Sequence, residues 1–261
     1  MDKQTIYQHF RSEESPIIDE LSSLMTQAAT EYRPILTDFL NPREVYIAQT
    51  LLNTEPDLRM KTSGLFHKAE RRRALFYPRY YEPNDADFEL SLILVKYPTK
   101  FATLKHSQVL GALTNIGIRR SLIGDIVTDS ERWQFVTATN MVNFLKLQVE
   151  SIGKVKVHLE EVDKAEIIAP IDEWQNYQLT VSSLRLDTLI AGVYNLSRKH
   201  VKDLLGSGKV VLNWMNIEKP DVEVAEHDIV SVRGYGRFRL NELQGVSKKG
   251  KIRVKTDVLK K

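Results

Sequence analysis

The sequence contains no cysteine, and this absence removes several kinds of chemistry at once. A chain without thiols has no disulfide, thiolate zinc site, iron–sulfur cluster or cysteine nucleophile. An apolar run of roughly 18 residues, the minimum for a transmembrane helix, is also missing. The first residues, Met1 to Thr5, lack the basic start and apolar block of a secretory signal. These absences predict a cytoplasmic protein with no membrane partner.

Neither sign of charge is in large excess, since the formal net charge of the 261 residues is only +3. The distribution along the chain is uneven, however. Residues 181–261 hold 16 lysines and arginines against 9 acidic residues, a net charge of +7. Residues 1–180 hold 21 against 25, a net charge of −4. A basic segment attached to a slightly acidic body predicts a module that binds a polyanion.

The length leaves room for two or three domains, and we expect an α+β protein. Residues 1–76 are predicted to form a helical N-terminal region. Pro16 and Pro42 stand where first-turn prolines stand, each followed by apolar residues at helical spacing.

The middle of the chain, residues 77–163, predicts strand, helix, strand, strand, helix, strand. This order is that of the ferredoxin-like or RNA-recognition-motif (RRM) topology. The glycine–aromatic pair of true RNA-recognition motifs is missing, so Trp133 and Phe135 are assigned to the core rather than to base stacking. Arg119 and Arg120 follow a predicted helix end, where they either complement the helix dipole or contact RNA.

Residues 164–180 show no clear period and are interpreted as a connector. Beyond it, residues 181–261 predict two short helices followed by strands and a basic C-terminal hairpin. The first helix presents Leu186, Leu189 and Ile190 to a core. Ser197 is placed to cap the second helix, which turns apolar residues inward and Arg198, Lys199 and Lys202 outward.

This last segment resembles the S-four-type RNA-binding domain, also called the alpha-L motif. The matching residues are Arg185-Leu186-Asp187, Leu189, Ser197-Arg198, Leu204-Leu205, Gly208-Lys209-Val210, Asn213, Asp228 and Val232. Two positions depart from the pattern, because Trp214 and His227 stand where many such domains have glycine. The resemblance implies binding of RNA.

The residues expected to contact RNA are mostly cations near a helix start or a turn. Unpaired backbone N–H groups and the positive end of the dipole attract phosphate there, and Arg185 could add a bidentate fork. The predicted RNA-binding residues are Arg185, Ser197, Arg198, Lys199, Lys202, Lys209, Arg233, Arg237, Lys248, Lys249, Arg119 and Arg120. Within this set Ser197 is expected to act mainly as a helix cap. Asp187, outside the set, is expected to be a structural partner of a nearby arginine or of an N-terminal helix turn.

Over nearly its full length the chain resembles the YlmH family of bacterial RNA-binding proteins. The residues that carry this resemblance, besides the S-four-type segment, are Arg233-Gly234-Tyr235-Gly236-Arg237-Phe238, Ser247-Lys248-Lys249-Gly250-Lys251, Gly117-Ile118-Arg119-Arg120, Ile123-Gly124-Asp125-Ile126 and Ala69-Glu70-Arg71. The resemblance implies a factor of ribosome-associated quality control that supports C-terminal tailing of stalled chains. Its implied partners are rRNA, tRNA and the large ribosomal subunit carrying peptidyl-tRNA, and it is expected to be a monomer off the ribosome.

Catalysis is not expected. Pseudouridine synthases, methyltransferases and tRNA synthetases also carry S-four-type domains, but their signatures are not found in this sequence. The six histidines show no metal-ligand spacing, and neither a metal nor another cofactor is predicted. The alternatives left open are an RNA-binding adaptor linked to cell division and an accessory protein of RNA modification.

Overall fold

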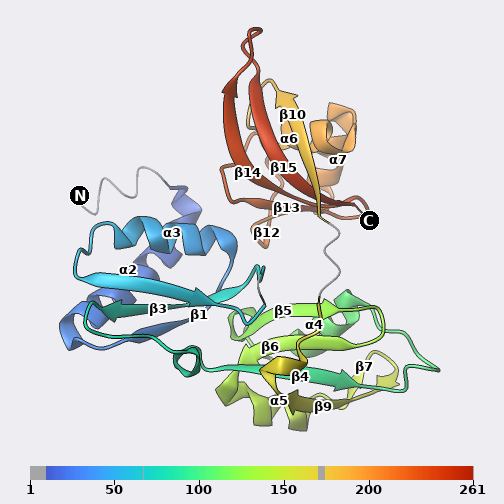
Figure 1. The fold of residues 1–261 in the computed structure, drawn as a ribbon. Coiled ribbons are helices and arrows are strands. Elements are labelled where there is room, and N and C mark those ends of the chain that lie inside the picture. Colours follow the sequence, from blue (N-terminus) through green and yellow to red (C-terminus); the bar gives the residue numbers. More distant parts are fainter. Residues whose placement is uncertain (1–9, 67, 170–173, 261) are drawn as a thin grey trace. The chain divides into compact units, whose positions relative to one another are not determined.

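The computed structural model describes residues 10–66, 68–169 and 174–260. The chain forms two compact units, Met1–Ile171 and Asp172–Lys261 (Figure 1). The division falls within the predicted connector, of which residues 170–173 lie outside the described part. Among the described residues, no helix is both long enough and apolar enough to cross a membrane.

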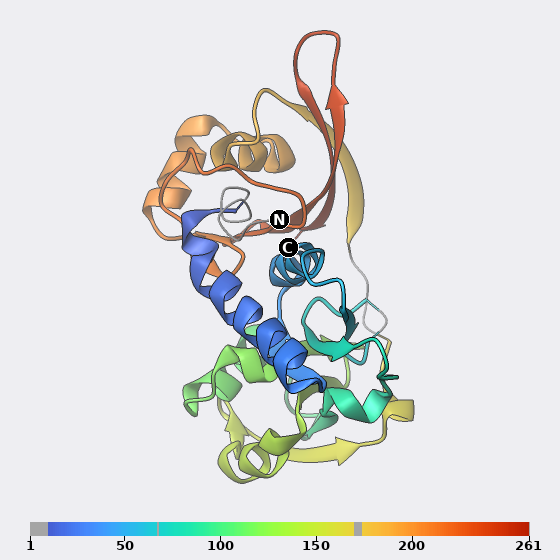
Figure 2. The ribbon, with the colours of Figure 1, turned by 90° about the vertical axis from the view of Figure 1, so that its left-hand side faces the viewer.

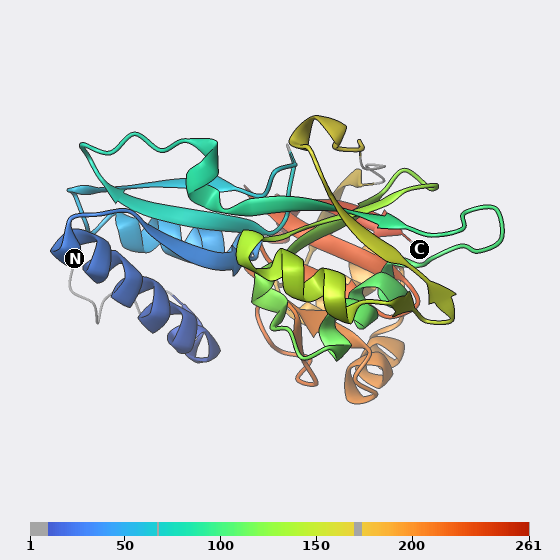
Figure 3. The ribbon, with the colours of Figure 1, turned by 90° about the horizontal axis from the view of Figure 1, so that it is seen from below.

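The N-terminal part of the first unit combines helices with a small antiparallel sheet in the order β1-β3-β2. Its elements are η1 (Ser12–Glu14), α2 (Ser15–Glu31), β1 (Ile35–Leu40), α3 (Pro42–Leu52), β2 (Leu58–Ser63) and β3 (Arg72–Pro78). Helices α2 and α3 cover one face of this sheet through a buried apolar cluster (Figures 2 and 3). Pro42 lies in the first turn of α3, after the capping residue Asn41.

The prediction of a helical region over residues 1–76 is therefore wrong for β1, β2 and β3, which it does not include. Strand β1 escapes prediction because its apolar residues do not alternate with polar ones in the sequence, since Ile35 and Leu36 are adjacent, as are Phe39 and Leu40. Its pairing with β3 also shifts register between Leu36 and Phe39. Strand β3 is buried on both faces and shows no alternation either. The predicted boundary between residues 76 and 77 falls inside β3.

The rest of the first unit has strand, helix, strand, strand, helix, strand in the predicted order. Its elements are η2 (Asp85–Phe88), β4 (Leu90–Lys96), α4 (His106–Asn115), η3 (Arg120–Leu122), β5 (Ile123–Thr128), β6 (Trp133–Ala138), η4 (Thr139–Met141), α5 (Val142–Gln148), β7 (Ser151–Ile152), β8 (Val155–Lys156), β9 (His158–Val162) and η5 (Lys164–Glu166). The four main strands pair antiparallel in the order β5-β6-β4-β9. Helices α4 and α5 pack on one face of this sheet (Figure 3).

The opposite face of this second sheet is buried against the N-terminal sheet. Leu92 and Val136 share a core cluster with Phe39 of β1 and Leu75 of β3. The fit is close at Gly124, since a Cβ atom there would lie 2.7 Å from the Phe39 ring. The two halves of the first unit therefore share one core and fold as one body.

The C-terminal unit is a six-stranded sheet with two helices on one face. Its elements are β10 (Gln175–Val181), α6 (Leu186–Tyr194), α7 (Arg198–Gly206), β11 (Val210–Leu212), β12 (Met215–Asn216), β13 (Ile229–Val232), β14 (Gly236–Val246) and β15 (Ile252–Lys260). The strand order is β10-β15-β14-β13-β11-β12. Helices α6 and α7 lie beside each other (Figure 2), and β14 and β15 form a long hairpin (Figure 1).

The prediction of a connector over residues 164–180 is wrong for its last part, because residues 175–181 form the edge strand β10, which pairs with β15. The strand alternates as a half-buried strand should, with Tyr177, Leu179 and Val181 toward the core cluster and polar residues between them. The C-terminal sheet thus begins before residue 181.

Candidate nucleic-acid interface

Helix α7 presents a row of cations at its N-terminal end. Ser197 caps the helix, because its side chain accepts a hydrogen bond from the backbone N–H of His200 at 3.2 Å. Arg198, Lys199 and Lys202 are exposed, whereas the inward apolar residues of the helix are buried. Asp203 is the one carboxylate of α7. Arg198 and Lys199 lie in the first turn of α7 and Lys202 lies one turn later. The unpaired N–H groups and the positive dipole end of that first turn suit a phosphate.

The turn between β13 and β14, in which Gly234 and Gly236 flank Tyr235, contacts α7. The Nε2 atom of His200 lies 2.7 Å from the hydroxyl of Tyr235, in the turn between β13 and β14. The Tyr235 ring also packs on Tyr194, with ring centroids 5.6 Å apart. Gly236 has φ +124°, and a Cβ atom there would lie 2.0 Å from a β15 carbonyl oxygen. Only glycine fits this position, so the turn between β13 and β14 has a defined backbone conformation.

A groove of about 510 Å³ opens where β11 and β14 begin and β13 and β15 end. Among the described residues that line it, Lys209, Arg233, Arg237 and Lys260 are cationic and none is acidic. Lys209 and Arg233 are direct neighbours, since the backbone N–H of Arg233 donates to the Lys209 carbonyl at 2.8 Å. A lining with cations and no acidic side chain attracts phosphate groups.

We call the α7 cations and the groove cations together the basic surface. Its members are Arg198, Lys199, Lys202, Lys209, Arg233, Arg237 and Lys260. Six of the seven are among the residues predicted from the sequence. Lys260 is not, because its position at the end of β15 becomes meaningful only once β14 and β15 are paired.

Arg185 is less free to bind phosphate than the sequence suggests. Its Nε and Nη2 atoms donate to the two carboxylate oxygens of Asp187, each at 3.1 Å. Burial alone raises the pKa of Asp187, but the hydrogen bonds and charge of Arg185 outweigh burial, so that this pKa lies below its ordinary value. The expected structural role of Asp187 matches this geometry. The sequence predicts that the guanidinium group of Arg185 is open to bind phosphate in a bidentate manner. In the structure Asp187 already accepts two of its hydrogen bonds.

Four other predicted residues do not belong to the basic surface. Lys248 and Lys249 are exposed at the tip of the β14–β15 hairpin. Strand β14 spans 11 residues, and at roughly 3.3 Å per residue the tip lies roughly 30 Å from the groove. Arg119 and Arg120 belong to the first unit. Arg119 is 74% exposed and pairs with Asp38 at 3.2 Å, whereas Arg120 donates to the carbonyl of Ile123.

The sheet of the middle region offers no open face for RNA. One face carries α4 and α5, and the other is the core shared with the N-terminal sheet. Trp133 and Phe135 are buried in the helix-side cluster, as predicted. Base stacking on a sheet surface, the mode of RNA-recognition motifs, is blocked in this arrangement.

The arginine run of residues 71–73 is structural. Arg71 and Arg73 are buried, and they donate to the backbone carbonyls of Phe39 at 2.9 Å and of Thr37 at 2.7 Å. Arg72 donates to the carbonyl of Ala69. The bonds of Arg71 and Arg73 attach these two arginines to the backbone of β1.

Asp125 fixes the loop before β3. Its carboxylate accepts the backbone N–H groups of Glu70 at 2.6 Å and Arg71 at 3.1 Å. Burial, followed by the charge of Glu70, raises the pKa of Asp125 to about 6, although the two N–H donors and Arg120 act in the opposite direction. In the described part of the chain, no group of three or more potential ligands is placed to hold a metal ion.

Comparison with known proteins agrees with the sequence resemblance. A family model described as "YlmH, N-terminal" matches residues 13–81, and one described as "Putative RNA-binding domain in YlmH" matches residues 83–166. The chain is 38% identical over 249 residues to "Ribosome-associated protein quality control protein P2" of Bacillus subtilis, covering 95% of this chain and 96% of that protein.

A solved structure is also similar. It is described as "Cell division protein ylmH from Streptococcus pneumoniae", with a TM-score of 0.55 and 36% sequence identity. The match covers 62% of this chain and 99% of that one. The names of these relatives and models describe RNA binding, quality control and cell division, and none of them is the name of an enzyme.

Proposed function

Since this chain belongs to the YlmH family, we propose that it is a non-catalytic factor that binds rRNA and tRNA on the large ribosomal subunit. We propose further that it serves ribosome-associated quality control in the cytoplasm, in the tailing of stalled nascent chains. The relative from Bacillus subtilis bears a name from this process. The observation that carries the proposal is the basic surface, with three exposed cations on α7 and four cations that line the groove.

The fold supports the assignment of the C-terminal unit as an S-four-type domain. Two short helices precede the sheet, and Ser197 caps the second helix at the start of the basic surface. We assign the region of β4 to β9 as RRM-like on its strand order. Because its sheet is covered on both faces, this region would contact RNA through loops or would serve as a scaffold.

The chemistry of the basic surface fits a folded RNA. Backbone N–H groups and the dipole of α7 can hold one phosphate, while Lys209 and Arg233 can hold another at the mouth of the groove. Contacts of this kind fix position along a backbone without reading sequence. The tip cations Lys248 and Lys249, roughly 30 Å away along β14, would reach a second RNA element. Two separated contacts are what a large ribonucleoprotein offers.

The test uses the variant with Arg198, Lys199 and Lys202 all changed to alanine. These side chains are exposed, so the variant should fold, with circular dichroism and thermal denaturation as checks. We expect a loss of affinity for an rRNA fragment at matched salt, similar for unrelated RNA sequences, as measured by fluorescence anisotropy. A folded variant that binds RNA as tightly as the parent would contradict the proposal.

A second candidate is an adaptor of cell division whose RNA binding is incidental. The name of the Streptococcus pneumoniae relative favours it. The two candidates differ in sedimentation. A ribosomal factor comigrates with large subunits and is stripped progressively by salt, because counterions compete for the phosphates. An adaptor does not comigrate.

A further inference from the structure

The sheet of the C-terminal unit has a second face, which α6 and α7 do not cover. Phe238, Leu240 and Val258 point into the core beneath the helices. Side chains alternate along strands, and cross-strand partners share a face. Arg237, paired with Leu259, and Arg239, paired with Asp257, therefore lie on the face away from the helices.

Two tryptophans lie against these arginines. The guanidinium of Arg237 lies 5.7 Å from the ring centroid of Trp174 and 5.9 Å from that of Trp214. The guanidinium of Arg239 lies 4.8 Å from the Trp174 ring. Both arginines are within the range of cation–π contact, so flat cationic and aromatic groups are interleaved. We call Trp174, Trp214, Arg237 and Arg239 the aromatic platform.

Trp214 occupies a backbone position that suits glycine. It follows Asn213 in the two-residue turn between β11 and β12, where φ is +46° at Asn213 and +65° at Trp214. Turns with two positive φ values favour Asn-Gly, because a bulky side chain crowds the left-handed conformation. Asn213 holds the turn, donating to Asp228 at 2.7 Å and accepting from Ile229 at 2.9 Å. The turn therefore needs no tryptophan.

The tryptophan also adds little to the core, since Trp214 is 40% exposed and does not belong to the buried cluster beneath the helices. A strained and exposed aromatic residue beside a cationic groove points to recognition of a ligand. Arg237 joins the two features, because it lines the groove and contacts both tryptophan rings.

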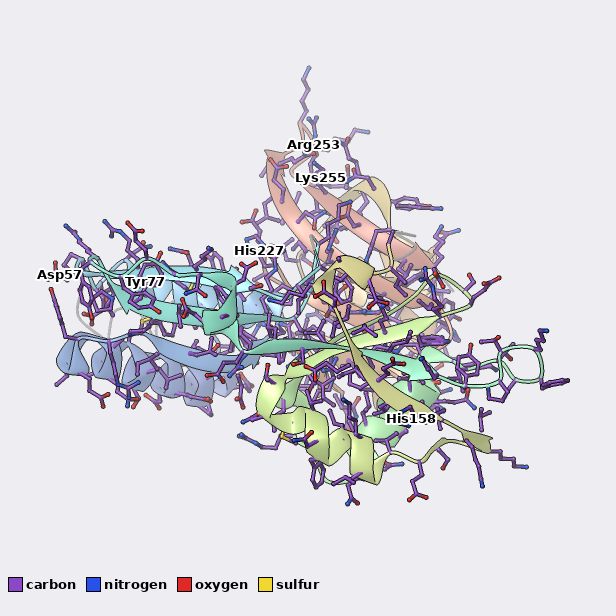
Figure 4. The ribbon with its side chains drawn as sticks, turned by 60° about the horizontal axis from the view of Figure 1, so that its bottom comes forward. Asp57, Tyr77, His158, His227, Arg253 and Lys255 are labelled. Carbon is purple, nitrogen blue, oxygen red and sulfur yellow. The ribbon has the colours of Figure 1, made fainter. Side chains whose placement is uncertain are left out.

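The charge of this face is mixed but positive. Arg239 is bound to Asp257 at 2.6 Å, and Glu242 pairs with Lys255 across the strands. Arg253 lies farther along β15 on the same side as Lys255 (Figure 4). Arg237 and Arg239, the cations of this face nearest the groove, lie against tryptophan rings. A ligand that combines negative charge with planar aromatic groups therefore fits this face better than a ligand that carries charge alone.

We propose that the aromatic platform stacks an unpaired RNA base while the groove holds a neighbouring phosphate of the same strand. The inference rests on the proposed function. It adds that the bound RNA contains a nucleotide whose base is unpaired and unstacked. Both α7 and the groove bind phosphate whatever the base. Only the platform makes binding depend on the presence of a base.

The test compares a single-stranded adenosine oligoribonucleotide with an abasic oligonucleotide of the same length and charge. We expect the parent protein to bind the adenosine strand at least roughly 5-fold more tightly. Tryptophan fluorescence should be quenched by the adenosine strand alone. The signal is specific, since the third tryptophan, Trp133, is buried in the first unit.

The deciding variant is Trp214→Gly, which removes the ring and relieves the backbone. It should fold at least as well as the parent and lose most of the preference for the adenosine strand, because one of the two tryptophan rings is removed. Trp214→Asn, which also tolerates a positive φ, serves if the glycine variant does not fold. Met215→Ala is the matched control, because Met215 is the adjacent exposed residue at 45% and should keep the preference for adenosine.

The outcomes separate this inference from the proposed function. A parent protein that binds both strands equally, or a Trp214→Gly variant that keeps the preference, overturns the platform and leaves the phosphate contacts standing. A parent that binds neither strand nor the rRNA fragment overturns the proposed function itself. Quenching by an acidic peptide and not by the adenosine strand would assign the platform to a protein partner and would refute the inference.

Discussion

Removal of two groove cations should change the salt dependence of RNA binding by a predictable amount. The perturbation is the double substitution Lys209→Ala and Arg233→Ala. The two residues are neighbours at the mouth of the groove and are exposed, so the fold should tolerate the change. If each side chain neutralises one phosphate, the variant releases two fewer counterions on binding than the parent does.

The magnitude follows from the count of contacts. Each phosphate contact contributes about 0.9 to the slope of log affinity against log salt, so a fourfold rise in salt costs about 3.5-fold in affinity per contact. If all seven cations of the basic surface engage phosphates, the parent should lose between about 10³- and 10⁴-fold from 50 to 200 mM salt. The double variant should lose about 12-fold less over the same range.

The assay is fluorescence anisotropy over a salt series, with an RNA hairpin too short to span β14. The matched control is the double variant Lys248→Ala and Lys249→Ala, which loses the same charge at the far end of the β14–β15 hairpin. Its slope on the short RNA should equal that of the parent. Equal slopes for the groove variant and the parent, or equal slope changes for the groove and tip variants, would refute the local phosphate contacts.

Three further results are expected. Arg185→Ala should lower the melting temperature of the protein, because it leaves the buried carboxylate of Asp187 without its charged partner. Gly236→Ala should cost about 2 kcal/mol or more in unfolding free energy, since its Cβ meets a backbone carbonyl, whereas Gly234→Ala, with open space around the Cβ, should cost about 1 kcal/mol. The raised pKa of Asp125, about 6 against an ordinary 3.8, means that the folded state binds more protons than the unfolded state between these values. Stability should therefore fall by about 2 kcal/mol as the pH rises from 4 to 6, measured as the difference between parent and Asp125→Asn in urea titrations; no difference would contradict the burial of this carboxylate.

The sequence allows the C-terminal helices to be predicted because their signals are local. The apolar spacing of α6 and α7, the Ser197 cap and the outward cations all lie within a few turns of one another. The order of strands and helices from β4 to β9 is likewise visible, since each element carries its own period. Three members of the basic surface, Arg198, Lys199 and Lys202, follow from the same local reasoning, whereas Lys209, Arg233 and Arg237 are predicted from the family resemblance.

Other features depend on tertiary contacts and could not be predicted. Strand β1 has adjacent apolar residues in the sequence although its burial alternates over residues 35–39, and β3 shows no alternation because it is buried on both sides. Lys260 joins the groove only through the pairing of β14 with β15.

Trp214 marks the limit of reasoning from a family pattern. In the sequence it is a departure from glycine that changes only a turn. In the structure the same residue has a positive φ and contacts Arg237, which gives the departure a physical meaning. Residues that break a local rule without a benefit to the core are candidates for function.

The most direct test of the central claim is sedimentation of the full-length protein with purified large ribosomal subunits over a salt series. We predict comigration at low salt and progressive release as salt rises, with release at lower salt for the variant lacking Lys209 and Arg233 and also for the variant lacking the tip lysines. Failure of the parent protein to comigrate at low salt, or comigration that salt and these substitutions leave unchanged, would contradict the account.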